Sequence, residues 1–187
     1  VVCVADFKGG VDYPAVWQEH CRFCFTLEEL MPLLDELLAI LEERKRLFKN
    51  AGCANLGEYN ATTDENLPRY IFACDEVAEV LDKTGLSKEQ KEQAAQVESR
   101  LATIARQGRA FGIHLILATQ RPDANILAGQ IKNNIDCRIC GRADNVLSQI
   151  ILDSTDASDR IPKTSRGRFL LHDGTVFQAF LFDDKTL

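Results

Sequence analysis

Two short apolar segments, each followed at once by polar side chains, limit most strongly what this chain can fold into. They are Tyr70-Ile-Phe-Ala-Cys74 before Asp75 and Glu76, and Ile113-His-Leu-Ile-Leu-Ala118 before Thr119, Gln120 and Arg121. Apolar runs of this length between polar residues indicate buried strands. Because ligands bind at the carboxyl ends of the strands in an open parallel sheet, we expect the two polar groups to face one site.

The rest of the chain alternates between helix-like and strand-like patterns. Helices are predicted over residues 26–48 and 87–107, each opened by a capping box. The boxes are Thr26 with Glu29 and Ser87 with Gln90. Further strands are predicted at 1–5 and 137–140, a short helix at 126–133, a polar loop at 50–68 and a hairpin from 167–171 and 176–182. The charged run at 42–46 is interpreted as a solvent face.

This order of elements predicts an α/β protein. Strands that alternate with helices favour a mostly parallel sheet with helices on both faces, here closed by a C-terminal β-hairpin. The length of 187 residues and the apolar fraction of 45% suit one domain with a real core. No run approaches the ~20 apolar residues of a membrane span. The seven cysteines, an odd number, are interpreted as reduced thiols rather than as a disulfide framework.

The net charge of −6 hides an uneven distribution of charge. Between residues 100 and 142 there are seven basic and two acidic residues, a balance of +5, and the remainder of the chain carries −11. A basic region on an acidic body is typical of a surface that binds phosphates or nucleic acid. The composition is equally compatible with scattered, solvated arginines.

The strand-end residues offer the chemistry of a nucleoside triphosphatase. A carboxylate at Asp75 can hold Mg²⁺ through water, and the neighbouring Glu76 can orient or deprotonate an attacking water. A neutral amide at Gln120 can bridge the γ-phosphate and that water. Each group alone is also compatible with an ordinary helix cap or loop start, but two such strand ends beside one cleft support each other.

Arg109 precedes the strand at 113–118 and should therefore lie at the opposite edge of the sheet from Gln120. It is either a cation favoured by the dipole at the end of a helix, which local reasoning prefers, or an arginine finger supplied to a neighbouring subunit. The sequence contains no Gly-x-x-x-x-Gly-Lys-Ser/Thr, so no segment provides the main phosphate-binding loop.

Four segments resemble the FtsK/SpoIIIE family, whose members are RecA-like hexameric ring ATPases that pump double-stranded DNA. They are Asp6-Phe-Lys-Gly-Gly10, the strand ending in Asp75 and Glu76, the run from Gly108 to Pro122, and Gly129-Gln-Ile-Lys-Asn-Asn-Ile135 followed by Arg138. The resemblance covers nearly the whole chain and implies a RecA-like P-loop NTPase core. Because the family pattern begins upstream with a P-loop, it also implies that residues 1–187 are a single, partial motor domain that follows the Walker A helix.

The resemblance implies roles for the strand-end residues. Asp75 corresponds to the Walker B carboxylate for magnesium, Glu76 to the catalytic carboxylate and Gln120 to the γ-phosphate sensor. Arg109 matches the family's arginine finger, which acts in trans, and this reverses the preference from local reasoning. The implied cofactors are ATP and Mg²⁺, and without a P-loop the 187-residue chain alone is expected not to hydrolyse ATP.

The resemblance also implies contacts with double-stranded DNA. Arg121 and Lys132 correspond to residues that line the central channel of the ring and contact DNA phosphates, independently of sequence and in a salt-sensitive way. Arg142 completes this basic set, although the lysine that many members carry a few residues after Arg138 is missing. The implied setting is a homohexamer in the bacterial cytoplasm, tethered to the inner face of the cell membrane through regions absent here, in conjugative transfer or chromosome segregation.

Two alternatives remain open at this point. The ATPases of type VII protein secretion share the Asp-Phe-Lys-Gly-Gly turn, so the cargo can be protein rather than DNA. A degenerate domain that joins a ring without hydrolysing ATP is the other. The basic set Arg121, Lys132 and Arg142 separates a DNA motor from a secretion ATPase, because DNA pumping needs this set inside the ring and peptide cargo does not.

Overall fold

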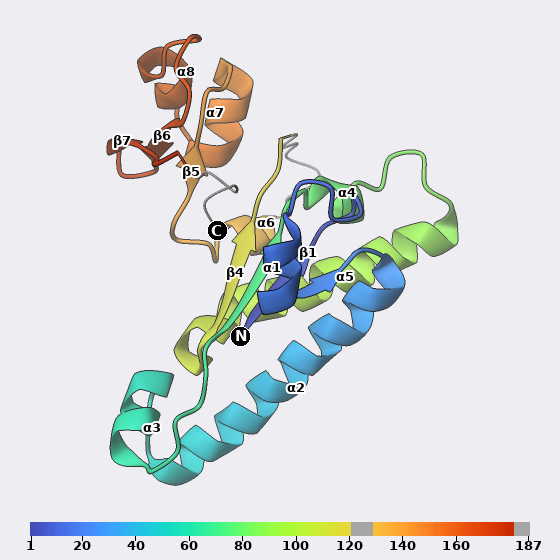
Figure 1. The fold of residues 1–187 in the computed structure, drawn as a ribbon, viewed down its shortest axis with the longest axis vertical. Coiled ribbons are helices and arrows are strands. Elements are labelled where there is room, and N and C mark those ends of the chain that lie inside the picture. Colours follow the sequence, from blue (N-terminus) through green and yellow to red (C-terminus); the bar gives the residue numbers. More distant parts are fainter. Residues whose placement is uncertain (121–128, 182–187) are drawn as a thin grey trace. The chain divides into compact units, whose positions relative to one another are not determined.

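The structure, a computed structural model of the 187-residue chain, describes residues 1–120 and 129–181. These residues form two compact units, one within residues 1–120 and the other within residues 129–181 (Figure 1). Each unit is built around a sheet of its own.

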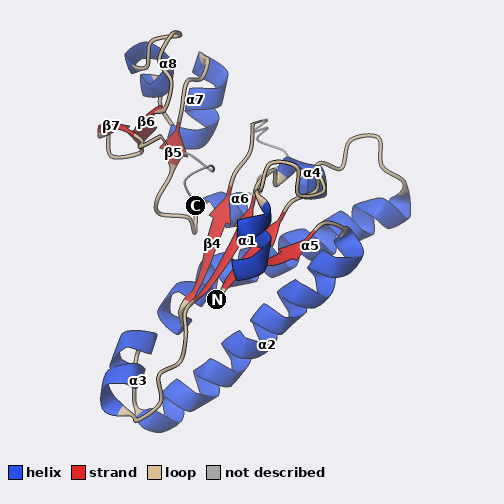
Figure 2. Cartoon of the chain, viewed as in Figure 1, coloured by secondary structure: helices blue, strands red, loops and turns tan. Residues whose placement is uncertain are grey.

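A four-stranded parallel sheet forms the centre of the first unit (Figure 2). Its strands, in the order β2-β1-β3-β4, are β1 (Val2–Ala5), β2 (Arg22–Cys24), β3 (Tyr70–Cys74) and β4 (Ile113–Leu117). The strands predicted at 1–5, 70–74 and 113–118 and their parallel arrangement are confirmed. Strand β2 was not predicted, because three residues are too few to display a period.

Helices α2 (Leu27–Ala51) and α5 (Lys88–Gln107) pack against each other in this unit (Figure 1). Ser87 and Gln90 form the complete capping box that the sequence predicts for α5. At α2 only half of the box forms: Thr26 accepts a hydrogen bond from the Glu29 N–H, but the Glu29 carboxylate accepts one from the N–H of Phe25.

One face of the sheet and one face of α2 supply the core of the first unit. Cys3 lies beside Phe72 in register, Ala5 lies beside Cys74, and all four are buried. The buried leucines of α2 recur every three or four residues, at Leu30, Leu33, Leu34, Leu37 and Leu41. Burial of each such side chain contributes roughly 1.5–3 kcal/mol to the stability of the folded state. This packing holds the sheet in place, and the carboxyl edge of the sheet carries the polar residues.

The remaining helices of the first unit are short. They are α1 (Ala15–His20), α3 (Leu56–Thr62), α4 (Ala78–Leu81) and the 3₁₀ helix η1 (Gly108–Phe111). Helix α3 lies within residues 50–68, where the sequence suggested only a loop. Its N-cap Asn55 accepts a hydrogen bond from the Glu58 N–H at 3.0 Å, and Tyr59 stacks on Phe48, which explains why so short a helix is held.

The second unit contains a three-stranded antiparallel sheet in the order β5-β6-β7. Its elements are α6 (Gly129–Lys132), β5 (Ile139–Cys140), α7 (Asn145–Leu152), α8 (Asp156–Arg160), β6 (Arg168–Leu171) and β7 (Val176–Gln178). The predicted hairpin is confirmed as β6 and β7, although its second strand ends at Gln178 rather than continuing through residue 181, and the strand predicted at 137–140 is also shorter than expected. The start of the helix predicted at 126–133 lies outside the described residues, as does Phe182.

The core of the second unit is small and separate. It consists of Cys140, Leu152, Ala157, Ile161 and Leu170. Across both units, no helix in the described part of the chain is long and apolar enough to cross a membrane.

Candidate active site at the carboxyl edge of the sheet

The polar groups that follow β3 and β4 lie side by side, as the strand pattern predicts. The backbone ladder between the two strands continues past their ends: Ala118 N–H donates to the Cys74 carbonyl, and Val77 N–H donates to the Ala118 carbonyl, both at 2.9 Å. This ladder brings Asp75 and Glu76 beside Thr119 and Gln120. The structure therefore joins two pairs of residues that lie more than forty positions apart in sequence.

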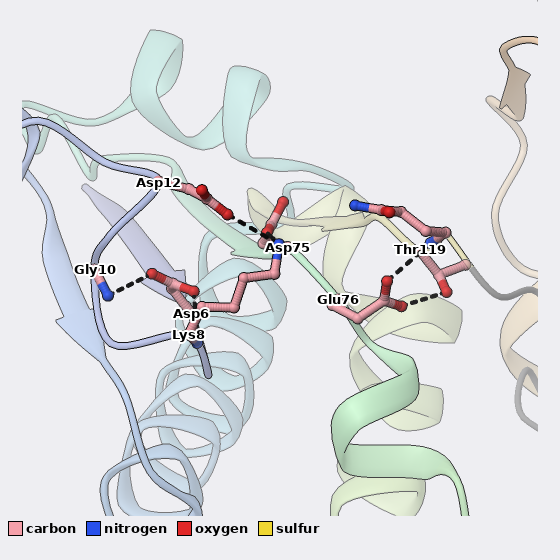
Figure 3. A network of polar contacts seen from close by, with 8 residues as sticks. Asp6, Lys8, Gly10, Asp12, Asp75, Glu76 and Thr119 are labelled. Carbon is pink, nitrogen blue, oxygen red and sulfur yellow. Dashed lines mark hydrogen bonds and ion pairs between the residues drawn. The ribbon is translucent and has the colours of Figure 1, made fainter.

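Glu76 is held by the end of β4. The Thr119 hydroxyl donates to one oxygen of its carboxylate, and the backbone N–H of Gln120 donates to the other at 2.9 Å (Figure 3). Two donors, one on each oxygen, fix the carboxylate in one orientation. Gln120 holds Glu76 through its backbone N–H, and Gln120 is itself an exposed residue.

Asp75 contacts a different set of residues. Its Oδ2 lies 3.2 Å from the Nζ of Lys8, which also donates to Asp12 Oδ2 at 2.9 Å (Figure 3). The hydrogen bonds to Asp12 and Asp75 raise the pKa of Lys8 above its usual range, so this ammonium group stays charged. The two adjacent carboxylates thus face different partners: Asp75 faces a cation and Glu76 faces the neighbouring strand.

The turn after β1 presents Lys8 to Asp75. The carboxylate of Asp6 is fully buried and accepts hydrogen bonds from the N–H groups of Lys8, at 2.9 Å, and Gly10, at 2.7 Å. Gly10 has φ +82, and a Cβ there would lie 3.0 Å from Gln18 Nε2. Aspartate and glycine are thus required by the shape of the turn itself.

Lys8 and Asp12 are site residues that the sequence reasoning missed. The available signal was the end of the first predicted strand: in a parallel sheet its polar residues lie at the same edge as Asp75. Which of those residues reaches the carboxylate depends on the register of β1 against β3, which pairs Ala5 with Cys74.

The carboxylates at this edge suit a magnesium ion that is held mainly by its nucleotide. Within the described residues there is no group of three or more His, Cys, Asp or Glu side chains that could enclose a metal. Asp75 and Asp12 nevertheless already converge on a cation, the Lys8 ammonium, and the side chain of Asp75 remains 32% exposed. Mg²⁺ in phosphoryl-transfer sites typically takes one or two protein carboxylates, with phosphates and water completing its shell.

Arg109 lies in η1, at the entry to β4, and so at the opposite end of that strand from Gln120. A five-residue strand separates the two ends by roughly 17 Å. The structure therefore does not bring Arg109 to Asp75 and Glu76.

A buried arginine holds η1 in place. Arg44 of α2 is 3% exposed and donates to the carbonyls of Phe111 and Pro68, both at 2.6 Å, and its guanidinium lies 5.3 Å from the centre of the Tyr70 ring. Burial lowers the pKa of Arg44. The interpretation of residues 42–46 as a solvent face is wrong for this side chain, because the two carbonyls and the ring draw it inward.

Of the predicted DNA-contacting residues, two are described. Lys132 Nζ lies 2.6 Å from Asp153 Oδ1, and Arg142 donates to the Lys163 carbonyl at 2.5 Å. Arg121 lies outside the described residues. The positive charge of Lys132 is therefore balanced within its own unit.

Comparison with known proteins gives relatives by sequence and by structure. No family model matches the chain. A DNA translocase FtsK of Chlorobaculum tepidum is 34% identical over 132 residues, which cover 70% of this chain and 15% of that protein. The structure of the pCW3 conjugation coupling protein TcpA, in a monomer form with ATPγS, is 38% identical in sequence and matches with a TM-score of 0.93. The match covers all of this chain and 53% of the TcpA chain.

A likeness to a secretion ATPase is also present. The cytoplasmic domain of the type VII secretion ATPase EccC of Thermomonospora curvata is 27% identical, with a TM-score of 0.64, over 91% of this chain and 20% of that one. The chain thus spans about half of the TcpA structure and a minor part of the FtsK and EccC chains.

Proposed function

The chain belongs to the FtsK/SpoIIIE family of ATPases, and on this premise we propose that it is the hydrolysis half of a motor that moves double-stranded DNA at the expense of ATP. The observation that carries the proposal is the meeting of Asp75 and Glu76 with Thr119 and Gln120 at one sheet edge. A magnesium carboxylate, a fixed catalytic carboxylate and an exposed amide are the parts that phosphoryl transfer requires there.

The phosphate-binding loop has to come from residues outside this sequence. Within the described residues β4 is an edge strand, and its Ile116 is 56% exposed. An apolar edge strand of a parallel sheet favours pairing with a further strand. We expect that strand to lead into the loop that binds the β- and γ-phosphates, and we expect the 187-residue chain alone to be inactive.

Each residue of the site has a distinct task in this proposal. Asp75 would hold Mg²⁺, which would neutralise charge on the nucleotide phosphates. Glu76 orients the attacking water and accepts its proton, held in place by Thr119 and the Gln120 N–H. In this proposal the side chain of Gln120 contacts the γ-phosphate, and its backbone N–H holds Glu76. Release of the phosphate can therefore shift the position of the catalytic carboxylate through Gln120.

Arg109 fits a role on a neighbouring subunit. Its position at the far end of β4 removes it from the site of its own chain, whereas a ring of identical subunits can place it at the next one. Arg44 then acts as a positioning residue, because it anchors the carbonyl of Phe111 two residues after Arg109. A homohexamer on the cytoplasmic side of a bacterial membrane is the assembly that we propose.

DNA is the cargo that the observations favour. TcpA, named a conjugation coupling protein, matches the whole chain at 38% identity, whereas EccC matches at 27%. A type VII secretion module, which moves protein, is the second candidate, and an inactive ring component is the third.

ATPase assays on the longer protein, with its phosphate-binding loop, test the proposal. We expect double-stranded DNA to stimulate hydrolysis, Glu76→Gln to abolish it, and DNA binding to weaken steeply with salt and on Arg121→Ala. Strong basal hydrolysis without any effect of DNA would favour protein secretion. The absence of hydrolysis in the wild type would favour the inactive component.

A further inference from the structure

A hollow of about 560 Å³ lies in the second unit, lined by the basic residues Lys132, Arg138 and His172 and by the acidic residues Asp136 and Asp153. We propose that Lys132 and Arg138 form a binding site for one phosphodiester group, and that the carboxylate of Asp153 occupies this site until DNA displaces it. The inference rests on the proposed function, because it takes DNA as the cargo. It adds Arg138 as a DNA-contacting residue and Asp153 as an internal competitor.

The contacts of Asp153 reproduce those of a bound phosphate. Its Oδ1 lies 2.6 Å from Lys132 Nζ, and its Oδ2 lies 2.6 Å from Arg138 Nη1. Each oxygen thus takes one cation, as two oxygens of a phosphodiester do when lysine and arginine bind it. Arg138 also donates to the Ile151 carbonyl at 3.0 Å, which keeps its guanidinium at this place when the carboxylate leaves.

The backbone of Asp153 indicates that its side chain determines its position. Asp153 ends α7 with φ +60 and is the one residue other than glycine with a positive φ in the described part of the chain. Glycine or asparagine usually fills this place, and a negative charge at the end of a helix is disfavoured by the helix dipole. The two ion pairs account for an aspartate here.

Exposure makes the carboxylate displaceable. The side chain of Asp153 is 58% exposed, whereas those of Lys132 and Arg138 are each 24% exposed. The two cations are therefore more deeply buried than the carboxylate that they hold, which leaves the carboxylate within reach of a competing anion. A hollow of this size admits a phosphate with its sugar, and such exposed ion pairs are individually weak enough to exchange.

Binding of a short double-stranded DNA to the 187-residue chain, followed by fluorescence anisotropy, tests the inference. The variants are Asp153→Asn, which keeps the shape, and Asp153→Gly, which suits φ +60 and removes both ion pairs. Asp156→Asn is the control, because it removes the same charge from a neighbouring residue that has no ion pair within residues 129–181. Thermal melting verifies that each variant is folded.

We expect Asp153→Gly to tighten DNA binding about three- to ten-fold and to steepen its salt dependence, since two weak competing ion pairs are removed. Asp156→Asn should change the affinity by less than about two-fold. Adding Arg138→Met to Asp153→Gly should cancel the gain.

The outcomes separate this inference from the proposed function. If the wild type binds DNA and Asp153→Gly binds no more tightly, the internal competitor is refuted while DNA remains the cargo. If none of the folded variants binds DNA, the phosphodiester site is refuted, whereas DNA as the cargo is decided separately by whether DNA stimulates ATP hydrolysis in the longer protein.

Discussion

Arg44 allows a quantitative test of how the first unit holds together. The change is Arg44→Met, which keeps an unbranched apolar stem and removes the guanidinium. It leaves the carbonyls of Pro68 and Phe111 without their donor. An arginine in a run of charged residues is not usually expected to matter for stability, so the prediction distinguishes the structure from the sequence pattern.

The size of the effect follows from the two hydrogen bonds. Each is donated by a charged group at 2.6 Å, and such bonds contribute about 1.5–3 kcal/mol. Removal of the buried charge offsets part of this loss, because the guanidinium no longer has to be desolvated. We expect a net loss of about 2–4 kcal/mol; a loss of about 3 kcal/mol lowers Tm by roughly 6–12 °C.

Urea unfolding of the 187-residue chain, followed by circular dichroism, provides the measurement. Arg46→Met is the matched control, because Arg46 lies in the same helix and is exposed. The control should stay within about 0.5 kcal/mol of the wild type. Arg44→Met variants that are as stable as the control, or more stable than the wild type, would refute the assignment of Arg44 as the anchor of η1.

Three further changes test other contacts. Thr119→Val removes one donor from Glu76, and in the longer protein we expect kcat to fall about ten-fold with little change in KM for ATP, whereas Thr119→Ser should retain most activity. Lys132 and Arg138 lower the pKa of Asp153 from 3.8 to about 2. The ionised carboxylate therefore stabilises the fold fully above about pH 4, and this stabilisation is lost as the pH falls towards 2. The difference in unfolding free energy between the wild type and Asp153→Asn should vanish over that range. Lys8→Met frees Asp75 from a competing cation, and isothermal titration of the chain should then show tighter binding of Mn²⁺, used as a magnesium probe, while Lys45→Met should show no change.

The sequence predicted the central part of the fold because its strands and its sheet edge follow from pattern alone. Tyr70–Cys74 and Ile113–Leu117 are apolar runs of strand length, and parallel pairing places their polar ends together. The adjacency of Asp75, Glu76 and Gln120 therefore needed no structure. Their chemical roles and that of Arg109 remain predictions.

Residues whose partners depend on register or burial were beyond the sequence. Lys8 reaches Asp75 only because β1 pairs with β3 at one particular offset, and the DNA-contacting role predicted for Lys132 gave no hint of its ion pair with Asp153. In the sequence, Arg44 cannot be distinguished from its exposed charged neighbours, because the carbonyls of Phe111 and Pro68 that it contacts lie far along the chain. In each case a long side chain meets a partner far along the chain, which local periodicity does not encode.

Displacement of a third strand from a DNA triplex by the longer protein tests the central claim most directly, because it reports movement along the duplex rather than hydrolysis alone. We expect displacement with ATP, none with ATPγS and none for Glu76→Gln, although that variant should still bind ATP and DNA. Displacement that persists in Glu76→Gln, or a wild-type protein that hydrolyses ATP and never displaces the strand, would contradict the account.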